Sequence, residues 1–118
     1  MRTIIAGSRG ITDPTLVRDA IAQSEFAVTH VLSGAARGVD RLAEAWAHAH
    51  TIPVTRFPAD WTREGTRAGF LRNARMAVAA EALIAIWDGQ SPGTRHMIQT
   101  AKDCGLRVFV FRVGAPSA

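Results

Sequence analysis

The sequence has little of what marks secreted, membrane-spanning or metal-binding proteins. Its 118 residues include a single cysteine, Cys104, which excludes an internal disulfide and makes the cytoplasm the expected compartment. Apolar runs such as Ala82–Trp87 fall far short of the ~20 residues that cross a bilayer. The first residues enter a strand-like segment at once, without the layout of a signal peptide. We therefore expect a protein without a membrane partner.

Several catalytic and cofactor motifs are also missing. No cysteine or carboxylate cluster joins the histidines at metal-ligand spacing, so we expect no metal site. Those histidines are His30, His48, His50 and His96. The sequence contains no G-x-S-x-G elbow, no P-loop lysine and no G-x-G-x-x-G dinucleotide fingerprint. We therefore expect no resident cofactor.

The composition indicates a globular chain. Apolar residues make up 47% and charged residues 20%, which excludes a disordered protein, and the length suits one core. We expect residues 1–113 to form one domain and residues 114–118 to form a flexible tail. The net charge of +4 is carried almost wholly by arginine, which suits an anionic ligand and equally an ordinary basic surface.

Strand-like and helix-like segments alternate along the whole chain. Helical spacing of apolar residues predicts helices over 14–23, 38–50, 68–80 and 93–105, with a long loop over 58–67. Short apolar runs predict strands over 2–6, 30–33, 53–57, 82–87 and 107–113. This alternation predicts an α/β fold of Rossmann-like type: a doubly wound parallel five-stranded sheet of order 3-2-1-4-5. Ligands of such folds bind beyond the carboxyl ends of the strands, here between the first and fourth.

The loop after the first predicted strand combines glycine with donor side chains. Gly7 and Gly10 allow the backbone to approach a ligand closely, while Ser8 and Arg9 supply donors. A plain tight turn is the alternative interpretation of this loop. We predict that all four residues bind the ligand.

The loop after the second strand leads into a helix, whose first amides suit an anion. Ser33, Gly34 and Gly38 are small, and Arg37 supplies a countercharge. Asp40 either contacts the ligand or caps the amides of the first helical turn. We include all five residues in the predicted binding site.

The segment after the third strand carries Asp60 and Trp61. An indole in a polar loop suits stacking on a base or ribose, although a surface anchor is the alternative. Asp60 suits ribose hydroxyls or the role of a base. Arg72 and Asn73, on the following helix, either face a phosphate or are solvated.

The loop after the fourth strand provides a second anion cradle. Asp88 and Gly89 end the buried strand, and the next helix starts near Gly93. Ser91, Thr94 and the helix amides are suited to phosphate. Because two such cradles flank one crevice, the sequence predicts a phosphorylated ligand there.

In combination and order, these loops resemble the YspA-like branch of the SLOG superfamily, a Rossmann-like group from bacteria and their phages. The resemblance covers nearly the whole chain and rests on residues 6–9, 33–40, 57–61, 72–76 and 88–94. It implies binding of nucleotides or ADP-ribose-like molecules through the glycine loops. It also implies a homodimer or larger homo-oligomer, because relatives often dimerise through helices and Trp46 lies on an apolar helix stripe.

Two branches of the superfamily imply different activities. The LOG phosphoribohydrolases release a base from a nucleoside 5′-monophosphate, and their R-K-x-x-M motif is partly matched by Arg72, Asn73 and Met76. Their P-G-G-x-G-T-x-x-E motif is matched only in part, and the position of its glutamate is Met97. The DNA-processing protein DprA has a loop similar to residues 33–40 and binds single-stranded DNA.

Three functions stay open from the sequence. The leading hypothesis is a sensor, sequestering or regulatory module that binds a phosphorylated nucleotide or ADP-ribose-like ligand. The second is hydrolysis of a nucleotide N-glycosidic bond, with Asp60 or Asp88 as the catalytic carboxylate. The third is binding of single-stranded nucleic acid, for which the sequence shows no obvious basic channel.

Overall fold

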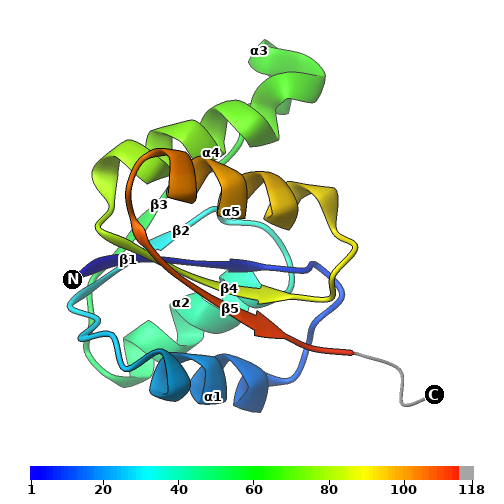
Figure 1. Cartoon of the computed structure of the whole chain (residues 1–118). Helices are drawn as coiled ribbons and strands as arrows, with labels where there is room; N and C mark the ends of the chain where they lie inside the picture. The colour runs from blue at the N-terminus through cyan, green and yellow to red at the C-terminus, as the bar shows by residue number, and fades with distance from the viewer. Residues whose placement is uncertain (115–118) are drawn as a thin grey trace.

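The alternating segments place five parallel strands in one sheet. A computed structural model describes residues 1–114 of the chain (Figure 1). The strands are β1 (Arg2–Gly7), β2 (His30–Ser33), β3 (Val54–Arg56), β4 (Ala82–Trp87) and β5 (Arg107–Arg112). All neighbouring pairs are parallel, and the order β3-β2-β1-β4-β5 confirms the predicted topology. Of the expected tail, all but Gly114 lies outside the described residues.

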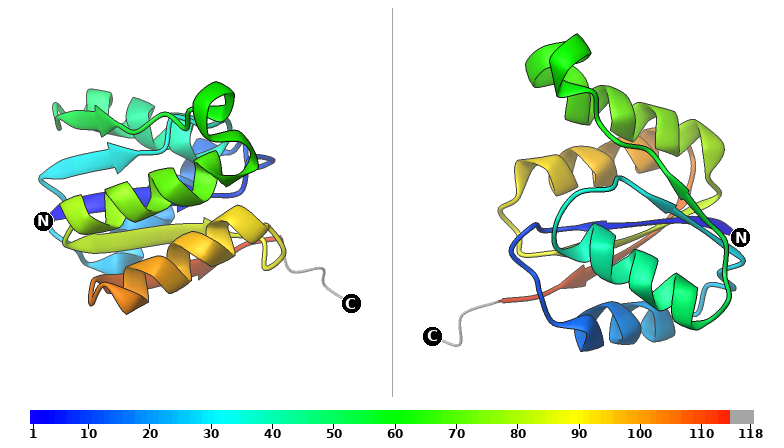
Figure 2. Two further views of the ribbon diagram at one scale, coloured as in Figure 1. Left: turned by 90° about the horizontal axis from the view of Figure 1, so that it is seen from above. Right: turned by 180° about the vertical axis from the view of Figure 1, so that it is seen from behind.

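Helices cover both faces of this sheet, so the architecture has three layers. One face carries α1 (Pro14–Ser24) and α2 (Val39–Ala49), and the other carries α4 (Ala68–Ala79) and α5 (Pro92–Asp103), as Figures 1 and 2 show. Right-handed crossovers between parallel strands produce this division. The carboxyl ends of β1 and β4 therefore point to the same edge of the sheet, where the chain turns into α1 and α5.

The segment 58–67, expected to be a loop, differs from the prediction. It contains a short helix, α3 (Trp61–Glu64), and a 3-10 turn (Gly65–Arg67) that leads into α4. Asp60 is the N-cap of α3, and its carboxylate accepts a hydrogen bond of 3.0 Å from the amide of Arg63. The cap satisfies an amide that a helix start leaves unpaired, which explains why so polar a segment forms a helical turn.

The core consists of two apolar clusters, one on each face of the sheet. Side chains of a strand alternate between faces, so Ile4 and Ile5 of β1 enter different clusters. Beneath α4 and α5 lie Ile4, Ala6, Leu32, Met76, Ala77, Leu83, Ala85, Met97, Ile98 and Ala101. Beneath α1 and α2 lie Ile5, Val17, Ala20, Ile21, Val31, Val39, Ala43, Ala47, Ile84 and Ile86. Both faces of the central strands are thus buried, which explains their nearly continuous apolar sequence.

Trp46, the basis of the expected homodimer, is half-buried on α2. Its side chain packs against the cluster beneath α1 and α2 and stacks on His50, with ring centroids 4.5 Å apart. Part of its apolar surface is therefore covered within the chain itself. Self-association through this helix stays a prediction.

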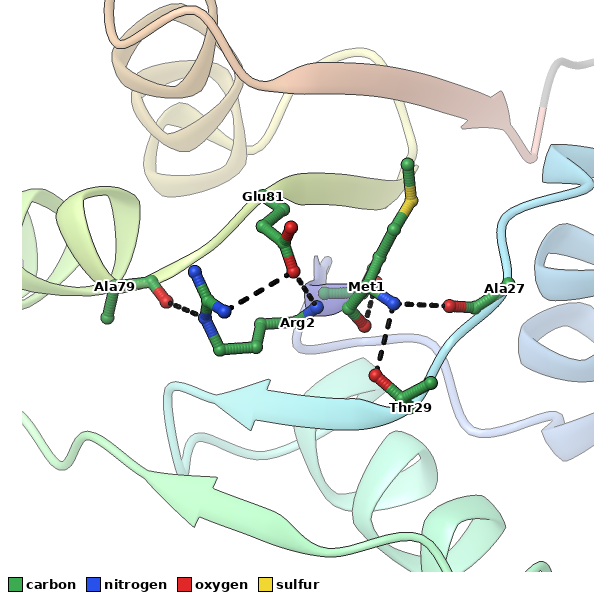
Figure 3. Close-up of polar contacts among 7 residues, drawn as sticks. Met1, Arg2, Ala27, Thr29, Ala79 and Glu81 are labelled. Carbon is green, nitrogen blue, oxygen red and sulfur yellow. Dashed lines mark hydrogen bonds and ion pairs between the residues drawn. The ribbon is translucent and has the colours of Figure 1, made fainter.

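The start of β1 is tied to the chain on both sides (Figure 3). The amino group of Met1 donates to the carbonyl of Ala27 at 2.6 Å and to the hydroxyl of Thr29 at 3.0 Å, just before β2. The amide of Arg2 donates to the Glu81 carboxylate at 2.8 Å, just before β4. These contacts stabilise the register of the central strand against both of its neighbours.

At its other end β1 approaches β4 and α2 so closely that only glycine fits. A Cβ atom on Gly7 would lie 2.1 Å from the carbonyl oxygen of Ile86 and 2.7 Å from Cγ2 of Val39. Gly38, just before α2, has a φ of +73°, and a Cβ there would lie 2.5 Å from the carbonyl oxygen of Ser8. These two glycines bring the loops after β1, β2 and β4 together.

We expect Gly7→Ala to destabilise the protein, because either the strand or α2 must move away from the added methyl group. The loss in the free energy of unfolding should be about 1–3 kcal/mol or more, as for other overpacked sites. Gly10→Ala is the matched control, since a Cβ at Gly10 meets nothing within 4 Å. Urea unfolding measures both variants, and an equal effect of the two would contradict the proposed close packing.

Candidate functional site

A cleft of ≈ 460 Å³ opens at the carboxyl ends of β1 and β4. The loop after β1, the start of α5 and one side of α4 form its walls, with Trp61 of α3 beside them. The side chains of Met76 and Met97, each 1% exposed, form an apolar floor. The cleft occupies the crevice where the strand order reverses, which is where doubly wound folds bind ligands.

Most of the predicted binding residues line this cleft. The lining residues that the sequence had indicated are Gly7, Ser8, Arg9, Gly10, Asp40, Trp61, Arg72, Asn73, Ser91, Gly93 and Thr94. Gly34 and Arg37 instead line a neighbouring pocket of ≈ 230 Å³. Ser33 is fully buried and donates to the Glu44 carboxylate at 2.6 Å, so it positions α2. Gly38 and Gly89 line neither space, and both are turn residues with positive φ.

Ser8 connects the loop after β1 to the loop after β4. Its amide donates to the carbonyl of Ile86 at 3.1 Å, and its hydroxyl accepts from the amide of Asp88 at 3.2 Å. The hydroxyl of Ser91 lies 3.0 Å from the same oxygen. Because Ser8 is 3% exposed, this network is shielded from water and holds the start of α5 against β1.

Asp88, a candidate catalytic residue, lies in the turn before α5 and does not line the cleft. One carboxylate oxygen accepts from the amides of Gln90 and Ser91, both at 2.8 Å, and the other accepts from the Ser91 hydroxyl. These hydrogen bonds, from the Ser91 and Gln90 amides above all, lower the pKa of Asp88. A carboxylate so stabilised as an anion is a weak base.

Asp60, the other candidate catalytic residue, is the N-cap of α3 and does not line the cleft either. Its position instead determines where Trp61 lies. The short helix is further tied to α4 by Glu64, which accepts from Arg75 at 2.5 Å. That hydrogen bond lowers the pKa of Glu64.

Asp40 is the one carboxylate that lines the cleft within residues 1–114. It belongs to the first turn of α2, is 6% exposed, and accepts a hydrogen bond of 3.1 Å from the amide of Ala36. Burial raises the pKa of Asp40 to about 6, while the Ala36 amide and the nearby Arg72 guanidinium oppose that rise. Because Ala36 precedes α2, Asp40 ties the loop after β2 to that helix and does not cap the amides of the first helical turn, and it lines the cleft as well.

Arg72 and Asn73 connect α4 to both neighbouring loops. The guanidinium of Arg72 donates to the carbonyl of Gly34, and its Nε donates to the amide oxygen of Asn73 at 2.9 Å. Asn73, 4% exposed, donates to the carbonyl of Gly93 at 3.3 Å and to Nδ1 of His96 at 3.1 Å. Asn73 therefore fixes Arg72 relative to the start of α5.

Two large aromatic side chains line the cleft while remaining half-exposed. Trp61 is 51% exposed and Phe70 is 49% exposed. Phe70 stacks on His96 of α5, with ring centroids 4.1 Å apart and planes 18° apart. Phe70 was not predicted from the sequence, and His96 was considered there only as a histidine without metal-ligating neighbours. The available signal was an aromatic residue two positions before Arg72, on a helix whose other face supplies the buried residues.

The residues that the structure describes contain no group of three or more histidine, cysteine or acidic side chains suited to a metal ion. Among the same residues, no helix has the length and hydropathy needed to cross a membrane. The cleft is lined by hydroxyls, amides, guanidinium groups, aromatic rings and one buried carboxylate.

Comparison with solved structures identifies a similar fold. The DNA processing protein A (DprA) of Streptococcus pneumoniae matches with a TM-score of 0.77 at 16% identity, over 98% of this chain and 52% of its own. The chain thus spans about half the length of DprA. At this identity the likeness concerns the fold alone.

Comparison with known sequences is more specific. The chain is similar to the Gene 61 protein of Mycobacterium phage D29, with 37% identity over 120 residues that cover 93% of this chain and 95% of that protein. The model of the family described as "YspA, cpYpsA-related SLOG family" matches residues 1–63. These matches confirm the resemblance predicted from the loop motifs, and the chain belongs to the YspA, cpYpsA-related SLOG family.

Proposed function

We propose that the cleft binds a phosphorylated nucleotide or ADP-ribose-like ligand, and that the chain is a sensor, sequestering or regulatory module for it. Membership of the SLOG family supports a nucleotide-related or nucleic-acid-related function in general. One observation carries the finer proposal: the start of α5 lines the same cleft as two pairs of side chains. These are the hydroxyls of Ser8 and Ser91 and the exposed rings of Trp61 and Phe70.

The start of α5 is suited to a phosphate group. The helix begins at Pro92, so the amides of Gly93 and Thr94 are the first donors of its positive end. Gly93 leaves the approach open, since a Cβ there would meet no atom within 4 Å. Arg9 and Arg72 line the same cleft and supply the countercharge.

The aromatic side chains are suited to the nucleoside part of the ligand. Water contact over half of an indole and a phenyl ring is unfavourable, and a stacked base would remove much of that apolar surface from water. The rigid stack of Phe70 on His96 limits the motion of one ring before the ligand arrives. Asp40 is placed to accept a hydrogen bond from a ribose hydroxyl.

Asp40 lowers the stability of the folded protein at neutral pH. Its pKa rises from an ordinary 3.8 to about 6 on folding, so the folded state holds the proton more tightly than the unfolded state. Stability due to this group is therefore greatest below pH 4 and falls as the pH rises towards 6. A carboxylate that destabilises the fold where it stands is typical of binding and catalytic sites.

The proposal includes no hydrolytic step. A carboxylate is needed to activate water or to stabilise the cation formed at the anomeric carbon. Met97 stands where the LOG motif has glutamate, and neither Asp60, the cap of α3, nor Asp88, in the turn before α5, lines the cleft. Asp40 is the one carboxylate of the described residues in the cleft lining, and because we assign it to a ribose hydroxyl we propose binding without turnover.

We expect Gly93→Asp to abolish nucleotide binding while leaving the fold intact. The new carboxylate would enter the open side of the cleft and repel a phosphate, yet an acidic residue in a first helical turn favours the helix. Gly93→Asn is the matched control, because it adds nearly the same volume without charge. The rise in melting temperature with AMP and with ADP-ribose measures both variants.

For the unmodified protein, a ligand at a hundredfold excess over its Kd should stabilise the fold by about 2.7 kcal/mol. Absence of a shift with every phosphorylated compound at millimolar concentration would contradict the proposal. Equal binding by Gly93→Asp and the unmodified protein would instead show that the phosphate lies elsewhere.

We expect Asp40→Asn to stabilise the unliganded protein at neutral pH. The amide keeps an acceptor for Ala36 but never carries the buried charge, so the gain above pH 6 should be roughly 1–3 kcal/mol. Below pH 4 the two proteins should have equal stability. Urea unfolding across this pH range measures the difference, and a gain independent of pH would contradict the assigned pKa.

We expect AMP to be recovered intact after incubation with the protein for hours at high protein concentration. Chromatography of the free base measures any release. Turnover lost in both Asp60→Asn and Asp88→Asn would contradict this expectation and support a hydrolase. Turnover lost in Asp40→Asn alone would place the reaction on the carboxylate that lines the cleft.

A further inference from the structure

A second space beside the cleft is lined by arginine. This pocket of ≈ 230 Å³ lies between the loop after β2 and the segment that leads into α3. Its four charged lining residues are Arg9, Arg37, Arg41 and Arg72, and no acidic side chain joins them. The arginines come from the loop after β1, the start of α2 and α4, so the fold itself gathers them.

None of these guanidinium groups forms an ion pair in the described part of the chain, and the Asp40 carboxylate lies close enough to Arg72 and Arg9 to attract both. The ion pairs found among residues 1–114 join Arg2, Arg18, Arg56 and Arg75 to acidic groups and include none of the four. Burial lowers the pKa of Arg72 most, the Asp40 carboxylate opposes that decrease, and the positive charge of Arg9 adds a smaller decrease. Four guanidinium groups beside one carboxylate leave a net positive charge, which attracts an anion.

The pocket adjoins the cleft and shares part of its lining with it. Arg9, Trp61 and Arg72 line both spaces. Ser91, Gly93 and Thr94 line only the cleft, whereas Arg37 and Arg41 line only the pocket. A nucleoside stacked on Trp61 would therefore have an anion site at each end.

We propose that the arginine pocket binds a second phosphate of the same ligand, and that the preferred ligand is a nucleoside with phosphates at two separate positions. This inference rests on the proposed function, because the first phosphate occupies the start of α5. A nucleoside 3′,5′-bisphosphate has the required arrangement. A 5′-diphosphate carries its phosphates on one ribose carbon and reaches only one of the two sites.

Calorimetric titration of the whole chain with AMP, ADP and adenosine 3′,5′-bisphosphate tests the proposal. The bisphosphate should bind roughly tenfold or more tighter than AMP, as expected for added charge-assisted hydrogen bonds. ADP carries a similar charge at one position of the ribose only, so its affinity should exceed that of AMP by a smaller factor. Equal affinity of ADP and the bisphosphate would overturn the second site and leave the proposed function standing. Absence of binding by all three would overturn both.

Arg41→Ala separates the pocket from the cleft. Arg41 is exposed and lines the pocket but not the cleft. Its loss should therefore weaken the affinity for the bisphosphate roughly tenfold and change the affinity for AMP by less than about twofold. Arg18→Ala on α1 is the matched control, since it removes the same charge at an exposed helical position outside both spaces. If both variants lowered the affinity for the bisphosphate equally, general electrostatic attraction would explain the effect, and the proposal would be overturned.

Discussion

The arrangement of the cleft depends on the close contact between the end of β1 and its neighbours at Gly7 and Ser8. Gly7 lets the backbone of β1 reach β4 and α2 without a side chain between them. Ser8 then uses its amide, carbonyl and hydroxyl on three different segments: Ile86 of β4, Val39 of α2 and Asp88 before α5. The starts of α2 and α5 are therefore positioned by two adjacent residues at the end of β1.

The site combines groups that favour the fold with groups that oppose it. Asp88 and Asp60 accept backbone amides and stabilise their turns. Asp40 and Arg72 instead carry buried charge, which is unfavourable and is offset only in part by their mutual attraction. The phosphorylated ligand that we propose would contact Arg72 through a phosphate and Asp40 through a ribose hydroxyl, and these contacts would offset the cost of burying both charges.

Much of the fold could be predicted from the sequence because its signals are local. The apolar run Ala82–Trp87 matches β4 residue for residue, and alternation with helices determines the strand order. Helix α3 was missed, because a four-residue helix has no apolar periodicity and depends on the single cap at Asp60. Phe70 was missed for a different reason: its place in the cleft depends on how α4 packs against α5. Individual loop motifs likewise did not reveal that Gly34 and Arg37 would face a separate pocket from Gly93.

Trp61 lies on an element that is too short to be stable by itself. Four helical residues cannot recover the entropy of nucleation, so α3 depends on its cap, on the contact between Glu64 and Arg75, and on its connection to α4 (Figure 1). Contacts of this kind at the surface open far more often than the buried sheet does. The wall of the cleft that carries Trp61 is therefore held by fewer contacts than the sheet beside it. Amide hydrogens of α3 should exchange with solvent long before those of β1 and β4, and a molecule stacked on Trp61 should slow that exchange.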